Sequence, residues 1–204
     1  MKKKYLFYFV HPAKYHFFKH TINQLKKEGH QVDIIITGRD ILEDLIKNEG
    51  WEYKLIFPKG RKIKGFPPKL SAIIYLIFTI YKLFWLTIGK GYHLFVTDDL
   101  TTFTGRMIGV PSIVVTDDDL SAVPESWILM ITANHIFSPE ICDLGKYSYK
   151  KIGYPVYKCL AHLHPNHFTP NKDFIDEAYK NETFFFIRTV SATSTHDLGR
   201  KGLS

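Results

Sequence analysis

The sequence predicts an α/β fold in which a parallel β-sheet carries helices on both faces. Short apolar runs typical of buried strands alternate along the chain with longer segments whose apolar residues recur at helical spacing. Strands that alternate with helices are usually parallel and joined by right-handed crossovers. The 204 residues suffice for one domain of this kind and part of another.

The expected elements follow one another in a regular order. The first apolar run is followed by a helical segment that ends next to Gly29, and a later helix is expected between a cap at Asp40 and Gly50. Strands are expected at 5–10, 31–37, 53–57, 93–97, 112–116, 135–138 and 150–153, and the other helices at 15–28, 70–88 and 100–108. Ligands of parallel sheets bind outside the carboxyl ends of the strands, so the candidate binding loops are 11–14, 37–40, 97–101 and 117–123.

The pattern changes after residue 153. Three prolines fall between residues 154 and 170 without a clear period, which is typical of a linker. A short helix is expected at 174–179, a new buried strand at 183–188, and a polar tail thereafter. We therefore expect a domain at 1–154, a linker at 155–182 and the truncated start of a second domain at 183–204, in a chain cut at Ser204.

Composition excludes several classes of protein. The net charge is +7, but no nucleic-acid-binding motif accompanies it, and we expect no nucleic-acid partner. Cys142 and Cys159 form neither a disulfide framework nor a zinc pattern, which favours reduced thiols in the cytoplasm. The apolar run that follows the basic residues 2–4 is six residues long, shorter than the signal-peptide core of about 7–15.

The segment 70–88 is unusually apolar, because Lys82 is its one charged residue. It is long enough to cross a bilayer, but a crossing there would separate the strands of the sheet. Two interpretations stay open. The helix is buried and the preceding basic loop is solvated, or the helix leaves an apolar face beside that loop and contacts an anionic membrane from the cytoplasmic side. The expected membrane contacts are Arg61, Lys62, Lys64, Phe66 and Trp85.

Two histidines lie where the first strand gives way to the first helix. His11 follows the strand at the ligand edge of the sheet, and an imidazole there could act as general base on an acceptor hydroxyl. It could equally cap the helix or bind a neighbouring loop. His16 lies one turn into the helix, where a structural role is favoured.

Aspartates follow two successive predicted strands. Asp98 and Asp99 follow the fourth, and Asp117 to Asp119 follow the fifth. If the two strands are neighbours, these carboxylates meet at one edge, where they could bind Mg²⁺, orient sugar hydroxyls or supply a base. The alternative is helix capping by Asp99, and by Asp119 or Ser121 ahead of residue 124.

Several short strings together resemble a known family. They are HPA at 11–13, HFF at 16–18, GHQV at 29–32, LAHLHP at 160–165, STHD at 194–197 and KGLS at 201–204. In this order they resemble a poorly characterised bacterial and archaeal family of the glycosyltransferase GT-B type. That family is distantly similar to UDP-N-acetylglucosamine 2-epimerases and to the lipid-linked N-acetylglucosaminyltransferase of peptidoglycan synthesis. Relatives tend to have a glycine-rich turn after the fourth strand, whereas this sequence has TDDLT at 97–101.

The resemblance implies a Rossmann-like first half of a GT-B architecture, whose second domain carries most of the nucleotide-sugar site. It implies a UDP-sugar donor, no metal or other cofactor, and a lipid-linked acceptor as one option. The expected catalytic residues are His11, Asp117 and Asp118. The expected substrate-binding residues are His16, Asp98, Asp99, Thr101, Arg188, Ser194 and His196.

Three functions remain open. The first is sugar-nucleotide-dependent glycosyl transfer in surface polysaccharide or glycolipid synthesis, with UDP-sugar epimerisation as its variant. The second is a non-catalytic module that binds an acceptor or a separate chain carrying the donor domain. The third is a metal-dependent phosphoesterase built on the aspartates. Under the first, the 204-residue chain is expected to be inactive alone.

Overall fold

The computed structural model describes residues 1–38, 41–58, 68–180, 182, 183, 185 and 187. The expected cap at Asp40, the expected membrane contacts between residues 61 and 66, and the expected site residues Arg188, Ser194 and His196 lie outside the described residues. The chain divides into two compact units, 1–162 and 163–204.

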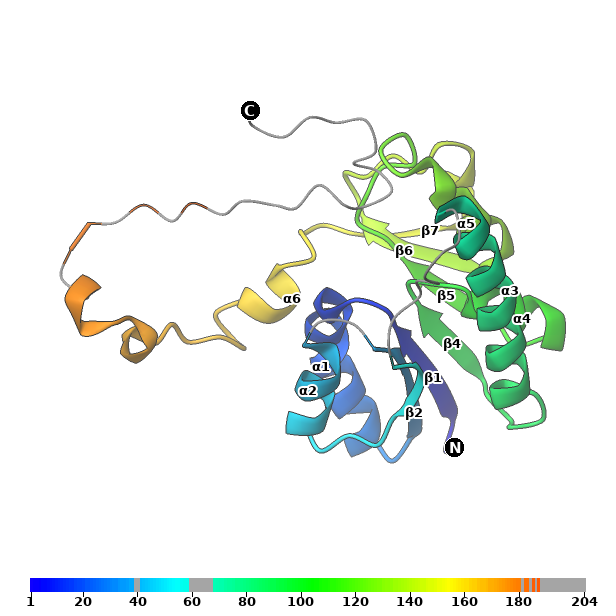
Figure 1. Cartoon of the computed structure of the whole chain (residues 1–204), viewed down its shortest axis with the longest axis horizontal. Helices are drawn as coiled ribbons and strands as arrows, with labels where there is room; N and C mark the ends of the chain where they lie inside the picture. Colours follow the sequence, from blue (N-terminus) through cyan, green and yellow to red (C-terminus); the bar gives the residue numbers. More distant parts are fainter. Residues whose placement is uncertain (39–40, 59–67, 181, 184, 186, 188–204) are drawn as a thin grey trace. The chain divides into compact units, whose positions relative to one another are not determined.

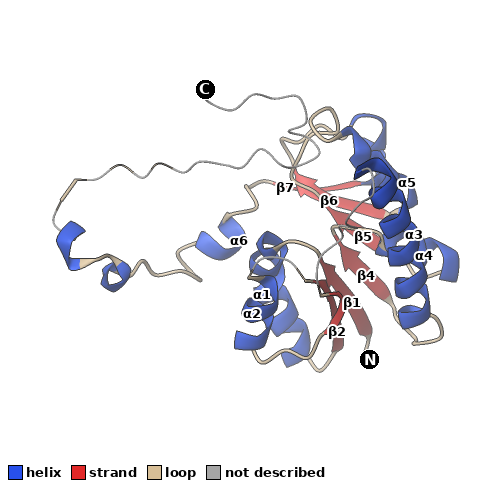
Figure 2. Ribbon diagram, in the orientation of Figure 1, coloured by secondary structure: helices blue, strands red, loops and turns tan. Residues whose placement is uncertain are grey.

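The first unit is built on a seven-stranded parallel sheet in the order β3-β2-β1-β4-β5-β6-β7. The strands are β1 (Lys4–Phe9), β2 (Gln31–Thr37), β3 (Lys54–Phe57), β4 (Leu94–Thr97), β5 (Ser112–Val115), β6 (His135–Pro139) and β7 (Lys151–Tyr154). The helices of this unit are α1 (Pro12–Lys27), α2 (Leu42–Asn48), α3 (Pro68–Thr87), α4 (Thr101–Ile108) and α5 (Trp127–Thr132), and α6 (Leu160–Leu163) lies at the boundary. The predicted parallel α/β sheet is confirmed, with α1 and α2 on one face and α3, α4 and α5 on the other (Figures 1 and 2).

The interior strand β1 is buried on both faces because its side chains alternate between two cores. Phe7 and Phe9 belong to the core that α1 and α2 cover, whereas Leu6 and Tyr8 belong to the core under α3 and α4. Tyr8 Oη is 2.8 Å from Thr37 Oγ1, so its hydroxyl is satisfied inside the sheet. This double burial explains why the strand is a continuous apolar run.

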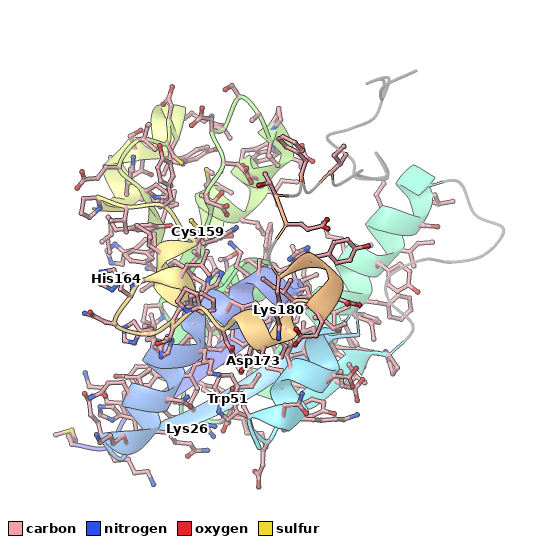
Figure 3. The ribbon with its side chains drawn as sticks, turned by 90° about the vertical axis from the view of Figure 1, so that its left-hand side faces the viewer. Lys26, Trp51, Cys159, His164, Asp173 and Lys180 are labelled. Carbon is pink, nitrogen blue, oxygen red and sulfur yellow. The ribbon has the colours of Figure 1, made fainter. Side chains whose placement is uncertain are left out.

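The α1 side of the sheet is closed at its edge by an aromatic contact. Trp51 precedes β3, and its Nε1 donates a hydrogen bond to Asn23 Oδ1 at 3.1 Å. Lys26 Nζ lies 5.0 Å from the centre of the Trp51 ring, a cation–π distance (Figure 3). Both partners lie on α1, so the tryptophan fastens this helix to the chain that enters β3.

The alternative of helix capping by Asp99, and by Asp119 or Ser121, differs from the N-caps that the structure shows, Leu100 and Val123. Asp99 Oδ1 accepts from the N–H of Leu100, and Leu100 is the N-cap of α4, without a capping hydrogen bond from its own side chain. Asp119 Oδ1 accepts from the N–H of Asp143 at 2.7 Å, so it holds a distant loop. The short 3₁₀ turn Pro124–Ser126 has Val123 as its N-cap, without a side-chain bond.

Two connections differ from the expected alternation. A 3₁₀ segment, Gly145–Lys150, joins β6 to β7 in place of an α-helix. In the second unit the expected helix at 174–179 is replaced by two 3₁₀ turns, Lys172–Phe174 and Glu177–Tyr179. The expected strand at 183–188 includes residues outside the described ones, and the expected domain boundaries stay a prediction.

The helix α3 exposes an apolar face. Its small polar residues Ser71 and Thr79 are buried, and Thr79 donates to the carbonyl of Tyr75. Ile77 and Tyr81, in contrast, are each 60% exposed. One face of α3 is therefore apolar and exposed, and its contact with a membrane stays a prediction. Among the described helices none combines the length and apolar character needed to cross a membrane.

Candidate functional site

A cavity of about 420 Å³ lies at the carboxyl ends of β1, β4 and β5. This is the edge of the sheet at which the sequence placed the binding loops. The charged residues that line it come from α1, from the loops after β4 and β5, from the turn before α5 and from the segment after β7. They are Lys14, Asp98, Asp117, Asp118, Glu125 and Lys158, and His11 lies beside them.

Lys14 ties the first helix to this edge. Its side chain is buried in the first turn of α1, which begins with Pro12, a residue favoured at that position. Its Nζ donates to the carbonyl oxygen of Val115 at 3.1 Å and lies 3.5 Å from Asp117 Oδ1. A buried ammonium needs such partners, so the end of β5 and Asp117 fix its position.

Asp117 is held between two lysines. Lys158, from the segment after β7, places its Nζ 2.5 Å from Asp117 Oδ2, while Lys14 approaches Oδ1. Burial raises the pKa of this carboxyl, but the hydrogen bond from Lys158 and the charge of Lys14 outweigh it and hold the pKa below its usual value. Asp117 is therefore ionised at neutral pH and bridges two separate elements.

Asp98 differs from Asp117 because its pKa is raised. Its Oδ1 is enclosed in the cavity wall and has no hydrogen-bond partner among the described residues. Burial raises the pKa of the Asp98 carboxyl to about 6, although the charge of Lys14 and backbone hydrogen bonds at Asp98 and Val10 oppose the shift. A carboxyl with this pKa exchanges its proton close to neutral pH.

We expect Asp98→Asn to remove a pH-dependent loss of stability. Below about pH 4 the carboxyl is protonated in both folded and unfolded chains, and it costs nothing. Between about pH 4 and 6 only the unfolded chain releases the proton, so stability falls as pH rises, and the full cost of about 2–3 kcal/mol is present above pH 6. Urea denaturation at pH 5 and pH 8 measures the free energy of unfolding of both proteins. The stability of Asp98→Asn relative to the wild type should be greater at pH 8 than at pH 5. An equal difference at both pH values would contradict it, and Asp118→Asn, at an exposed carboxylate, is the control.

His11 caps the helix α1 from the loop after β1. Its Nδ1 accepts from the N–H of Ala13 at 3.2 Å, which is the capping role left open by the sequence. In the neutral imidazole the proton therefore resides on Nε2. To act as a base, His11 would have to release the hydrogen bond from Ala13. The base role stays a prediction.

His16 lies one turn further along α1, away from the cavity. Its ring is 5.1 Å from the ring of His162 on α6. Burial, and then the charges of His162 and Lys19, lower the pKa of His16. Burial and Lys158 likewise lower the pKa of His162. The two imidazoles are therefore mainly neutral at pH 7, and the contact is a packing contact.

The structure brings some expected site residues together and separates others. His11, Asp98, Asp117 and Asp118 share the cavity. Asp99 lines a neighbouring cavity of about 330 Å³ instead. Thr101 is fully buried at the start of α4 and lines neither cavity. No group of three or more histidine, cysteine, aspartate or glutamate side chains suited to a metal occurs in the described part of the chain.

Sequence reasoning missed the two lysines. Lys14 occupies an ordinary helical position, and the available signal was its place in the first turn at the ligand edge. Lys158 lies in a segment without periodicity, and nothing in the sequence pairs it with Asp117. The cysteines are free. Cys142 is buried, and Cys159, which is labelled in Figure 3, is exposed.

Known structures share this fold. No protein-family model matches the sequence, and no curated protein matches it significantly. Among solved structures, MurG of Acinetobacter baumannii superposes with a TM-score of 0.52 and 15% identity, over 67% of this chain and 41% of that chain. A UDP-N-acetylglucosamine 2-epimerase superposes with a TM-score of 0.53 and 12% identity, over 74% of this chain and 44% of that chain.

These similarities define the class of fold. The chain has the Rossmann-like α/β fold of the N-terminal domain of GT-B proteins, to which it is distantly similar. The predicted Rossmann-like α/β fold is thereby confirmed. The chain spans less than half the length of these two proteins.

Proposed function

We propose that this chain is the acceptor-side part of a sugar-nucleotide-dependent glycosyltransferase in surface polysaccharide or glycolipid synthesis. The observation that carries the proposal is the cavity at the carboxyl edge, where a GT-B-like sheet gathers four carboxyl side chains and two lysines among the described residues. Such a cavity can bind sugar hydroxyls and accept a proton from one of them.

The catalytic roles follow from the environment of each side chain. Transfer to a hydroxyl needs a base on the acceptor and stabilisation of the departing diphosphate. Asp117 is neutralised by Lys14 and Lys158, so it serves to hold the site together. The candidate bases are His11 and Asp118. Asp98 is a third candidate because its pKa is about 6.

The donor nucleotide is held elsewhere in this proposal. A second domain, or a separate partner chain, supplies the groups that bind UDP and stabilise the diphosphate. The predicted site residues Arg188, Ser194 and His196 would contribute to that part. Support comes from the two solved structures, of which this chain spans 41% and 44%.

The protein works at the cytoplasmic face of a membrane in this proposal. The exposed apolar face of α3 follows directly in sequence on the basic segment that contains Arg61, Lys62 and Lys64. Apolar and basic groups together bind anionic lipid surfaces. The sugar of a glycolipid or lipid-linked acceptor would then enter the cavity while its lipid stays in the bilayer.

Release of UDP tests the function. The protein encoded by the whole reading frame is incubated with UDP-N-acetylglucosamine or UDP-glucose and glycan acceptors. We expect acceptor-dependent release of UDP, reduced at least about tenfold in His11→Gln or Asp118→Asn. The 204-residue chain alone should release none, and release that is lost in His11→Ala would overturn that expectation.

Epimerisation is the second candidate, and the similarity to a UDP-N-acetylglucosamine 2-epimerase favours it. The same assay separates the two reactions. An epimerase inverts the sugar without an acceptor, which proton NMR of the UDP-sugar detects. If the protein catalyses neither transfer nor epimerisation with any UDP-sugar, the proposed function is contradicted.

A further inference from the structure

The charges that line the cavity are unbalanced. Its described lining carries four carboxyl groups, on Asp98, Asp117, Asp118 and Glu125, against the two ammonium groups of Lys14 and Lys158. The excess is negative even though the chain as a whole has a net charge of +7. The character of this site therefore differs from that of the whole protein, and a ligand experiences the local charge first.

Both lysines are already engaged. Lys14 donates to the carbonyl of Val115 and approaches one oxygen of Asp117, and Lys158 binds the other oxygen. These contacts join α1, β5 and the segment after β7. An anionic ligand could recruit either lysine only by displacing Asp117, which would leave that carboxylate close to the new anion.

Two other carboxyl groups of the cavity, on Asp98 and Asp118, form no ion pair with these lysines within the described residues. Asp118 is exposed, and its carboxylate makes no hydrogen bond or ion pair within the described residues. Asp98 has an enclosed Oδ1 without a partner in the described structure. An ionised carboxylate accepts hydrogen bonds and donates none, so it suits a hydroxyl donor and disfavours a phosphate.

We propose that this cavity selects a neutral, hydroxyl-rich sugar as acceptor and disfavours a sugar that carries a phosphate on the group entering it. The inference rests on the proposed function and deepens it by naming the acceptor class. Sugar hydroxyls donate to Asp118 and Asp98, while Asp117 keeps its two lysines. A phosphate dianion in the same volume is repelled by the excess carboxylates.

Binding of two matched sugars tests this proposal without any UDP-sugar. The probes are methyl β-D-glucoside and glucose 6-phosphate, titrated into the ¹⁵N-labelled protein at pH 7.5. Shifts of the backbone N–H signals of Thr116, Asp117 and Asp118 report binding in the cavity. We expect the neutral glucoside to bind at least about tenfold more tightly than the phosphate, the size expected for repulsion between a dianion and nearby carboxylates.

Charge variants locate the cause. Asp118→Asn should reduce the preference for the neutral sugar about threefold or more, because one repelling charge is gone. Asp44→Asn makes the same change at an exposed site on α2 and should leave the preference unchanged. A preference that falls equally in both variants would assign the effect to overall charge and overturn the proposal.

The outcomes for acceptor and enzyme are distinguishable. Tighter binding of glucose 6-phosphate, or no binding of either sugar, overturns the acceptor proposal. UDP release that depends on a phosphorylated acceptor also overturns it, while the proposed transfer reaction stands. If the protein prefers the neutral sugar but turns over no UDP-sugar, the proposed transfer reaction fails. The cavity then binds neutral sugars for another purpose.

Discussion

Replacing Lys14 by Met should lower the free energy of unfolding by about 2–4 kcal/mol at pH 7.5. The substitution removes the donor to the Val115 carbonyl and one of the two cations at Asp117, while the carboxylate stays partly buried. It also removes the positive charge that opposes the raised pKa of Asp98. All three effects act in the same direction, and urea denaturation measures their sum.

Lys19→Met is the matched control on the same helix. Lys19 forms an ion pair with Glu49, but its side chain is 35% exposed, so the pair should contribute no more than about 1 kcal/mol. A second variant, Lys14→Met with Asp117→Asn, should recover part of the loss because no buried charge is left without a partner. If Lys14→Met is as mild as Lys19→Met, Lys14 does not anchor α1 to β5.

The parts of the fold that could be predicted are those with two-sided burial. The run at 5–10 became β1 because a central parallel strand is apolar on both faces, and the same holds for β2. The connections around β6 and β7 were harder to predict from the sequence. The helix α5 has six residues, too few for a helical period to emerge, and a 3₁₀ segment replaces the last crossover helix.

The candidate site was predicted in part for a topological reason. Strands β1, β4 and β5 are neighbours, so His11, Asp98 and Asp117, which follow their ends within two residues, had to meet. What the sequence could not show was the state of each carboxyl. Lys14 and Lys158 approach Asp117 across about one hundred and about forty residues of chain, and no local pattern records such a pairing.

Replacing Ile77 and Trp85 by Glu should strongly weaken attachment of the protein to anionic vesicles. Both side chains are 60% exposed on α3, and each should lose on the order of 1 kcal/mol or more of apolar transfer energy. The added negative charges also face an anionic surface. Together the changes should weaken partitioning at least about thirtyfold, which co-sedimentation with vesicles measures.

The basic segment should set the salt dependence of this attachment. Each cation near an anionic surface contributes on the order of 1 kcal/mol, which salt screens within a Debye length. Replacing Arg61, Lys62 and Lys64 by Glu should therefore remove binding at low salt. Ile141→Glu changes a 73% exposed side chain in the loop after β6 and should have little effect. A folded wild-type protein that does not bind strongly anionic vesicles at low salt would contradict membrane attachment, and the apolar face of α3 would then require a protein partner.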